Sequence, residues 1–507
     1  MLFTLHNLSR TFYYTLLFLL VGFSISAQQL KVVSIDSAQR TQGGIRIQAA
    51  LTPNKCYRID KIVIEGNRRT KESIIRRELD FKEGDCIPSA KADSLLKWER
   101  NKIYNLNLFI TADLSIARND SSGLSTLFIK VREQFYTIPQ PILDISDRNY
   151  NEWIFVHGAD LRRVNIGMKI TQRNVLGLNQ TLRFNIQGGF TNLFEVSYDI
   201  PYLNKKQRTG MSVFCSYSNN RSVGYASRID TIRFFPEVSR LTLANPIIKN
   251  FFRAGFVINY RRYFFTKHSL ETGFNYNLVD DTIAKLNPQY FLYGNTTQQY
   301  LNIKYTLDDD RRDIKQFAHK GRLYRLEVEQ LGFTPWESQQ TSRLYLTHSR
   351  YFEFGKRFLY ATKVKLKTSF PVIQPYTDAR ALGSGEDFVR GYDRHPIEGQ
   401  HYVLYRNSFR FKTFSTLIDF KKIIPIRQFR VVPLDFYLTA FADAGYVSNQ
   451  NSYSTNELGN NRYSNKLLGC LGLGINLVTF YNSVLRLEYS CNLNGEFNPS
   501  FFMATDI

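Results

Sequence analysis

The sequence predicts a mainly β protein in which a large transmembrane β-barrel follows one small α+β domain. From about residue 163 onward, segments of about ten residues alternate apolar with polar side chains, which is the pattern of a wall between lipid and water. Aromatic residues make up 15% of the 507 residues, as expected where aromatic girdles meet two membrane interfaces. Before residue 135, the order strand, helix, helix, strand, strand predicts the small α+β domain.

Composition and charge limit the classes of protein and partner. A hydrophobic fraction of 43% and a mean hydropathy of −0.30 exclude a bundle of membrane-spanning helices. The formal net charge of +22 raises anionic lipid, acidic polymers and nucleic acid as partners. The sequence contains no basic block with helix or zinc-finger spacing, so we expect no nucleic acid among the partners.

The first 27 residues have the features of a secretory signal peptide. His6 and Arg10 precede an apolar run at 12–23, and Ser24 to Ala27 supply small residues for cleavage. The alternative is an uncleaved anchor, which the shortness of the apolar run disfavours. Residues 28–55 are polar without a firm period and are expected to form a flexible leader.

The small domain is predicted over residues 56–135. The β-branched run at 62–64 predicts a strand, and Thr70 can cap a short helix. Pro88 and Ser89 open a second helix that reaches about Tyr104. Two strands with alternating apolar residues then close the domain, and their apolar positions are Ile110, Ala112, Leu114, Ile116, Leu127, Ile129 and Val131.

The sequence contains five cysteines, which is an odd number, and no two of them form a CxxC pair. They predict neither a zinc site nor a disulfide scaffold. Cys56 and Cys86 fall in the same small domain of an exported protein. They form either one disulfide or two free thiols.

The barrel is predicted over residues 163–507, after a connector at 136–162. Alternation is clearest in segments that carry charges on one face and apolar residues on the other, at 182–187, 195–200, 301–308, 363–367 and 485–490. A soluble β-sandwich would show a similar polar face. The signal peptide, the aromatic content and the repetition of the pattern favour a membrane barrel.

One long segment, at 371–400, interrupts the alternation and contains Phe388 to Arg394. Arg390 can lay a planar fork of donors against a carboxylate, and Gly391 lets the backbone approach closely. We therefore expect a loop folded into the barrel lumen, whereas the alternative is a basic surface turn.

The small domain resembles a POTRA domain, the polypeptide-transport-associated module. The resemblance rests on the string from Ile59 to Thr70, on Ile74, on Arg77 to Leu79, and on Gly84-Asp85. It implies that the domain holds unfolded client chains by adding a strand to an exposed sheet edge. From the sequence we place that edge on the last strand, at Leu127, Ile129 and Val131.

Val389-Arg390-Gly391-Tyr392 resembles the arginine motif of the BamA/TamA family of outer-membrane protein assembly factors. The strand from Leu438 to Val447 resembles the family's Phe-x-Asp-x-Gly strand. The resemblance implies a sixteen-stranded antiparallel barrel, an outer-membrane location with the POTRA domain in the periplasm, and Asp443 as the partner of Arg390.

The same resemblance implies a function in inserting or transporting client proteins. The implied partners are unfolded outer-membrane or secreted proteins, accessory assembly subunits and outer-membrane lipid. We expect a client strand to pair with the first barrel strand near residues 164–171, at the seam with the last strand. The alternatives are a dedicated two-partner secretion pore and a passive, porin-like barrel.

Enzymatic motifs are missing from the sequence. The seven histidines show no HExxH spacing, and Gly383-Ser384-Gly385 is not a nucleophile elbow. Asp308 to Asp310 are followed directly by Arg311 and Arg312, which neutralise them. We therefore expect no enzymatic activity, no catalytic residue, no cofactor and no metal.

Overall fold

The computed structural model describes residues 56–504, except 105, 119–123, 205–207, 229–230, 239–245, 264, 316, 335–336, 384, 420–430, 451–461 and 480–483. The predicted signal peptide and flexible leader lie outside the described residues. Among the helices of the described residues, none is both long and apolar enough to cross a bilayer.

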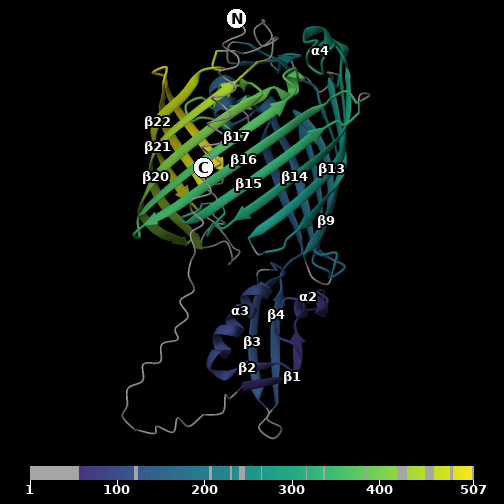
Figure 1. Ribbon diagram of the computed structural model, residues 1–507, viewed down its shortest axis with the longest axis vertical. Coiled ribbons are helices and arrows are strands. Elements are labelled where there is room, and N and C mark those ends of the chain that lie inside the picture. Colours follow the sequence, from purple (N-terminus) through teal and green to yellow (C-terminus); the bar gives the residue numbers. More distant parts are fainter. Residues whose placement is uncertain are drawn as a thin grey trace, which may run out of the picture. The chain divides into compact units, whose positions relative to one another are not determined.

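The small domain has a four-stranded sheet with two helices packed against it (Figure 1). Its helices are α2 (Glu72–Arg76) and α3 (Ala92–Tyr104), and its strands are β1 (Cys56–Glu65), β2 (Cys86–Pro88), β3 (Phe109–Arg118) and β4 (Leu124–Glu133). The strand order is β2-β1-β4-β3, in which β1 runs parallel to β4 and the other pairs are antiparallel. The structure agrees with the predicted order of elements and adds the short strand β2.

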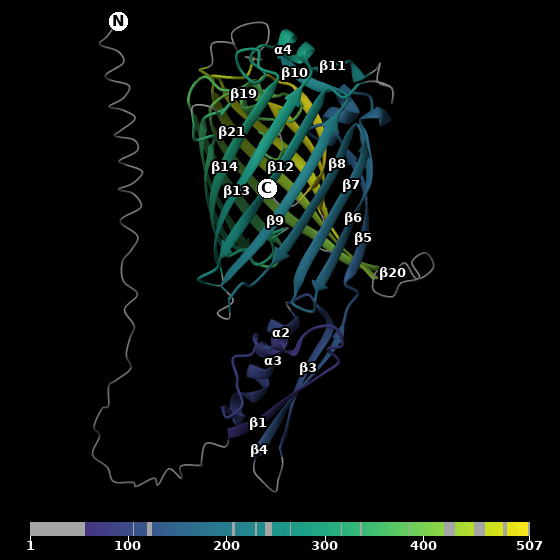
Figure 2. The ribbon, with the colours of Figure 1, turned by 90° about the vertical axis from the view of Figure 1, so that its right-hand side faces the viewer.

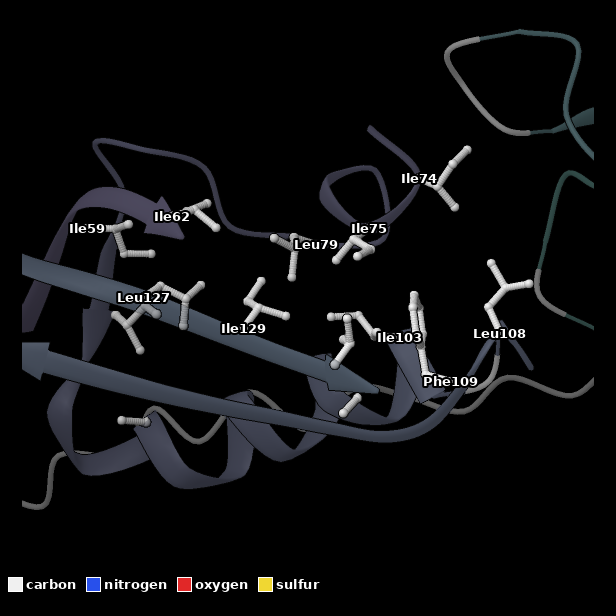
Figure 3. Packing of buried hydrophobic residues seen from close by; sticks show 14 of the residues in the cluster. Ile59, Ile62, Ile74, Ile75, Leu79, Ile103, Leu108, Phe109, Leu127 and Ile129 are labelled. Atoms are coloured by element: carbon white, nitrogen blue, oxygen red, sulfur yellow. The ribbon is translucent and has the colours of Figure 1, made fainter. Parts of the chain in front are cut away.

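Apolar side chains from both helices and from the sheet form the core of this domain (Figure 3). Ile75 of α2, Ile103 of α3 and Leu127 and Ile129 of β4 are completely buried. Full burial of each such side chain contributes about 1.5–3 kcal/mol relative to exposure. The apolar residues that alternate along β4 therefore pack into the core of the domain.

A disulfide and a partly buried carboxylate connect separate segments of the domain. Cys56 and Cys86 are disulfide-bonded, with their Cα atoms 5.6 Å apart, and so join β1 to β2. Glu133, at the end of β4, accepts hydrogen bonds from the backbone and the hydroxyl of Thr70. Burial raises the pKa of Glu133, but the hydrogen bonds from Thr70 outweigh it and hold the pKa below its usual range.

The remaining chain forms a sixteen-stranded antiparallel sheet curved into a barrel, as Figures 1 and 2 show. In sheet order its strands are β5 (Thr137–Ile145), β6 (Val164–Val175), β7 (Gln180–Gly189), β8 (Thr191–Ile200), β9 (Thr209–Asn220), β12 (Lys249–Tyr260), β13 (Thr266–Val279), β14 (Thr297–Asp310), β15 (Gly321–Leu331), β16 (Thr341–Phe354), β17 (Phe358–Phe370), β20 (His401–Asp419), β21 (Val431–Ser448), β22 (Leu467–Val478), β23 (Val484–Asn492) and β24 (Phe497–Ala504).

Smaller elements occupy the connections between these strands. They are the hairpin β10 (Val223–Arg228) and β11 (Thr231–Phe235), the helix α4 (Asp281–Leu286), and the strand pair β18 (Arg380–Leu382) and β19 (Ile397–Glu398). We call the end of the barrel at which β5 begins the proximal end and the other the distal end. The small domain leads directly into the proximal end of β5.

The predicted start of the barrel is wrong. Residues 136–162 were expected to be a connector, and the first strand was expected near 164–171. Instead Thr137–Ile145 is the first strand, β5, and Val164–Val175 is the second. Pro139 and Pro141 argue against a strand at this place in the sequence, because proline is rare in strands except at a sheet edge. In the structure β5 is such an edge strand, so both prolines are tolerated.

The wall of the barrel has one apolar and one polar face. On β22, Leu471 and Leu473 are 68% and 67% exposed and point outward, away from the lumen. Cys470 and Asn476, on the opposite face of the same strand, are buried. The lumen side therefore carries the buried polar and charged residues that build the candidate site.

Candidate functional site

The loop at 371–400 connects β17 to β20 and lies against the inner wall of the barrel. Its strands β18 and β19 pair with each other, and Val389 and Tyr392 are 0% and 1% exposed. These two side chains belong to an apolar cluster that also includes Leu404 of β20 and Phe441 of β21. The segment is thus buried in the lumen rather than forming the alternative basic surface turn.

Arg390 and Asp443 are in direct contact at the centre of this cluster. Nε of Arg390 donates to Oδ2 of Asp443 at 2.7 Å, and Nη2 donates to Oδ1 at 2.5 Å. The backbone N–H of Arg390 donates to the same carboxylate at 3.2 Å. Arg390 is 2% exposed, so this bidentate contact fixes both the side chain and the backbone of the loop.

Neighbouring strands complete the surroundings of Arg390. Ser408 of β20 accepts a hydrogen bond from Nη1 at 3.2 Å, and Glu488 of β23 lies 3.5 Å from the same nitrogen. Arg406 of β20 approaches Asp443 at 3.5 Å. Arg390 and Arg406 therefore share the Asp443 carboxylate in one buried site, with Glu488 beside Arg390. Burial of an ion network of this kind favours a fixed geometry over net stability.

Glycines provide the space for the loop. Gly391 has φ of +81°, a conformation that favours glycine, and a Cβ there would lie 3.1 Å from Oγ of Ser490. On the wall, a Cβ at Gly445 would lie 2.5 Å from Cγ2 of Val389. Gly445 follows Asp443 by two residues on β21. The Asp-x-Gly spacing therefore places the counter-charge for Arg390 beside a hollow for Val389.

The predicted client-binding edge of the POTRA domain is wrong. Leu127, Ile129 and Val131 lie on β4, which is an interior strand between β1 and β3. Their side chains are 0%, 0% and 4% exposed. The ten-residue edge strand is β3, and sequence order alone could not show this because β1 pairs in parallel with β4. Any added strand must bind at β3 or at the opposite edge, which is formed by the short β2 and by the part of β1 that β2 does not pair with.

The seam between the ends of the barrel sheet lies beside the loop. In the sheet order, β5 and β24 are the two terminal strands, and no ladder joins them among the described residues. Residues 146–163, between β5 and β6, lie alongside β24, and we call them the seam segment. Oδ1 of Asn151 accepts a hydrogen bond from the backbone N–H of Phe501 on β24 at 2.8 Å.

Asp393 connects the loop to the seam. Its carboxylate accepts a hydrogen bond from Nδ2 of Asn151 at 2.7 Å and another from the hydroxyl of Ser500 on β24 at 3.2 Å. Nη2 of Arg394 donates to the carbonyl of Pro499 at 2.7 Å. Side chains of the loop and the seam segment thus satisfy backbone groups of β24 that a neighbouring strand would otherwise satisfy.

Proline prevents a regular ladder at this seam. Ser146 donates its N–H to Arg163, and Arg173 donates to Tyr136, so the even-numbered residues of β5 form the hydrogen-bonded pairs with β6. The odd-numbered residues therefore direct their backbone groups to the free edge. Pro139 and Pro141 are both odd-numbered, and neither has an N–H.

The free edge of β24 lacks fewer backbone donors than the free edge of β5. The N–H of Asn492 donates to the carbonyl of Glu496, in the register that continues along β23 and β24. The even-numbered residues of β24 therefore direct their backbone groups toward β23, and the odd-numbered residues direct theirs toward the free edge. Pro499 is the proline at that edge of β24. The gap without donors is about 20 Å on β5, from Thr137 to Leu143, and about 13 Å on β24.

The seam segment also holds a cluster of ionisable groups. Asp147, Glu152 and His157 bring potential metal-ligand atoms within 4.8 Å of one another. Both oxygens of Asp147 already accept hydrogen bonds from Arg163, and Glu152 accepts one from Nε of Arg148. Since two arginines already neutralise the two carboxylates, this cluster serves as an ion-pair network that holds the segment in shape.

Sequence reasoning identified Arg390 and Asp443 but missed the residues of the seam. Asn151 has no signal of its own, because a lone asparagine in a loop is usually a turn residue. Asp393 and Arg394 fall inside the loop motif, yet their partners Ser500 and Pro499 lie about a hundred residues away. The proline pair in β5 can be seen in the sequence, but two nearby prolines are also typical of a connector.

Residues 174–494 match the model of the Omp85 superfamily domain. The chain belongs to the Omp85 superfamily. Residues 57–134 match the POTRA model, described as a surface antigen variable number repeat, which agrees closely with the predicted domain. The sequence-based assignment to the BamA/TamA type of barrel with one POTRA domain is confirmed.

Relatives of this Omp85 protein include the outer membrane protein assembly factor BamA of Neorickettsia risticii, which is 28% identical over 196 residues. That alignment covers 37% of this chain and a quarter of the length of the relative. The crystal structure of BamA from Haemophilus ducreyi lacking POTRA domains 1–3 aligns with a TM-score of 0.57 and 14% identity, over 88% of this chain and 83% of that one. CdiB from Acinetobacter baumannii aligns with a TM-score of 0.49 and 14% identity, over 88% and 73%.

Proposed function

We propose that this Omp85 protein resides in the bacterial outer membrane, with its POTRA domain in the periplasm, and inserts or transports client proteins there. The observation that carries the proposal is the free edge of β24, where side chains of the loop and the seam segment satisfy backbone groups that a neighbouring strand would otherwise satisfy. A barrel wall in lipid needs its backbone groups satisfied. A seam satisfied by side chains supplies those groups and can still open at one place.

The seam favours one edge for an incoming strand. On β5, the N–H groups of Pro139 and Pro141 are missing, and the N–H of Ile145 is held by Oδ1 of Asp144. On β24, the edge groups of Phe501 and Pro499 are held by Asn151 and Arg394, which can be displaced. We therefore infer that a client strand docks on β24, rather than on the first barrel strand, and replaces these two side chains.

The POTRA domain supplies an earlier binding step. Its edge strand β3 exposes Thr111, Asp113 and Ser115 on one face, while Ala112 on the other face is buried. An extended client segment can add to the free edge of β3 through backbone hydrogen bonds, which do not depend on the client sequence. This step suits a factor that handles unfolded outer-membrane or secreted proteins, alone or with accessory subunits.

The loop has a positioning role in this scheme. Arg390 anchors it to the wall at Asp443, and Asp393 and Arg394, three and four residues later, reach the seam segment and β24. Rigid attachment at Asp443 therefore fixes where the seam contacts form. The energy for insertion comes from the client itself, whose strands gain a closed, hydrogen-bonded barrel in lipid. No nucleotide is needed.

A reversible lock across the seam tests the proposal. The rings of Tyr150 in the seam segment and Phe501 on β24 are neighbours, with centroids 6.0 Å apart, so we choose Tyr150→Cys with Phe501→Cys as the seam lock, in a chain whose other free cysteines are replaced by alanine. Loss of free thiol on oxidation shows that the lock has formed. Phe352→Cys with Tyr360→Cys is the matched lock, because these residues face each other on β16 and β17, with ring centroids 6.1 Å apart.

We expect oxidation of the seam lock to stop the accumulation of newly made outer-membrane proteins in cells that depend on this chain, and reduction to restore it. The matched lock should leave accumulation unchanged. Equal activity of the oxidised and reduced seam lock would show that the seam does not open during function, as for a passive porin-like barrel. Loss of export of one protein, with all others unaffected, would identify a dedicated secretion pore.

A further inference from the structure

A second polar site lies in the lumen, near the proximal end and on strands other than those that hold the Arg390 loop. It is a cavity of about 480 Å³, which we call the proximal cavity, lined by side chains from β7, β8, β9, β12 and β13 and from their proximal turns. Its charged lining residues are Arg183, Asp199, Arg208, Arg261 and Lys267. The function proposed above assigns no role to this cavity.

Positive charge in the proximal cavity exceeds negative charge. Arg183 forms an ion pair with Asp199, the carboxylate among the lining residues. Among the described residues, no carboxylate forms an ion pair with Arg208, Arg261 or Lys267. Three cationic side chains therefore face one cavity without an ion pair to a carboxylate of the described residues.

Strand register places these three cations side by side. The ladder between β9 and β12 ends at Thr209 and Tyr260, and the N–H of Arg261 donates to the carbonyl of Arg208 at 2.7 Å, so Arg261 lies opposite Arg208. The ladder between β12 and β13 pairs Tyr260 with His268, so the same register, continued by one residue, places Lys267 opposite Arg261.

Like charges directly opposite each other on neighbouring strands are destabilising. The next carboxylate along the row is Asp308, which faces Lys267 on β14. Asp308 is held by Nε of Arg325 at 2.5 Å, on the strand beyond it. The three cations therefore repel one another, and Asp308, the nearest acid along the row, pairs with Arg325 instead of with them. Such an arrangement becomes favourable when an anion binds between the cations.

We propose that the proximal cavity binds a phosphate-bearing anion. Phosphate carries more than one negative charge and several acceptor oxygens, which match three cations without ion pairs better than a single carboxylate does. Hydroxyl and amide donors complete the lining, including Ser212 of β9 and Asn259 of β12. The ligand is either the headgroup of an anionic lipid or a soluble phosphate compound, since both offer the same chemistry.

Two double variants of the full chain in neutral detergent test this site. Arg261→Gln with Lys267→Gln removes two charges from the proximal cavity. Lys356→Gln with Arg357→Gln is the matched control, since it removes two charges from an exposed turn at the same end of the barrel. The probes are pyrophosphate, cardiolipin, zwitterionic phosphatidylethanolamine and a ten-residue polyglutamate peptide. The readouts are the unfolding temperature and the dissociation constant for each probe.

We expect pyrophosphate, cardiolipin or both to raise the unfolding temperature of the parent and of the control. The cavity variant should bind the same probe about tenfold more weakly or worse, because two charge-assisted contacts are lost. Stabilisation by pyrophosphate identifies a soluble source, and stabilisation by cardiolipin without pyrophosphate identifies a lipid headgroup.

Without any probe, the cavity variant should unfold at the same temperature as the parent or higher, because it loses like-charge repulsion. A lower unfolding temperature would assign these cations to structure and overturn the proposal. Equal affinities of parent and cavity variant, or stabilisation by polyglutamate but by neither phosphate probe, would also overturn it.

Discussion

Arg390 and Asp443 form a bidentate ion pair across 53 positions of sequence, with Nε to Oδ2 at 2.7 Å and Nη2 to Oδ1 at 2.5 Å. The pair joins a loop to the wall strand β21 at a point where both side chains are at most 2% exposed. It is the fixed point from which Asp393 and Arg394 reach the seam. The predictions below test this pair, the seam and the POTRA edge.

Removing the counter-charge should destabilise the barrel strongly. Asp443→Asn leaves Arg390 and Arg406 buried together with Glu488 as their remaining carboxylate, and breaking a buried pair in this way costs about 3–5 kcal/mol. The measurement is the temperature at which the folded barrel loses its faster mobility in gel electrophoresis.

The matched control for this variant is Asp435→Asn, on the same strand. Asp435 pairs with Lys412 at 3.0 Å, and the side chains are 34% and 29% exposed, so its loss should cost less than about 1 kcal/mol. Equal effects of the two substitutions would contradict the anchoring role of Asp443.

Restoring donors to the free edge of β5 should close the seam. Pro139→Val with Pro141→Val supplies two N–H groups at the free edge of β5, and each new hydrogen bond made there contributes about 1 kcal/mol. We expect a higher unfolding temperature and slower assembly of client proteins in cells that depend on the variant.

Gln140→Val is the control on the same strand, because residue 140 directs its backbone toward β6 and adds no donor to the free edge. If the double proline variant assembled clients at the parental rate despite a higher unfolding temperature, function would not require a seam without a backbone ladder.

The POTRA edge should be detectable by site-specific photocrosslinking. A photoreactive residue in place of Asp113, exposed on edge strand β3, should capture client chains. The same residue in place of Lys61, exposed on β1, should capture few, because it lies two strands or about 10 Å from that edge. A yield at residue 61 as high as that at residue 113 would place the client elsewhere on the domain.

Local pattern predicted much of the fold. Alternation identified the wall strands, and helical spacing identified α3, because these signals depend on neighbouring residues. Strand order did not follow from pattern. The interior position of β4 results from its parallel pairing with β1, which is a non-local choice. The position of β5 was missed because its prolines are tolerated at an edge that exists after the whole sheet has formed.

The candidate site divides in the same way. Arg390 and Asp443 could be paired from the sequence because each lies in a motif that resembles a known family. Asn151, Asp393 and Ser500 meet from three distant parts of the chain, and no spacing rule connects them. The cations of the proximal cavity became visible when strand register placed Arg208, Arg261 and Lys267 in one row.

The central claim is that clients enter the membrane at the seam between β5 and β24. The most direct measurement is photocrosslinking in living cells from Phe497, which is 63% exposed on the outer face of β24, compared with Leu346, which is 41% exposed on β16. We predict that newly made barrel proteins are captured at residue 497 and not at residue 346. Equal capture at both positions, or none at residue 497, would contradict entry at the seam.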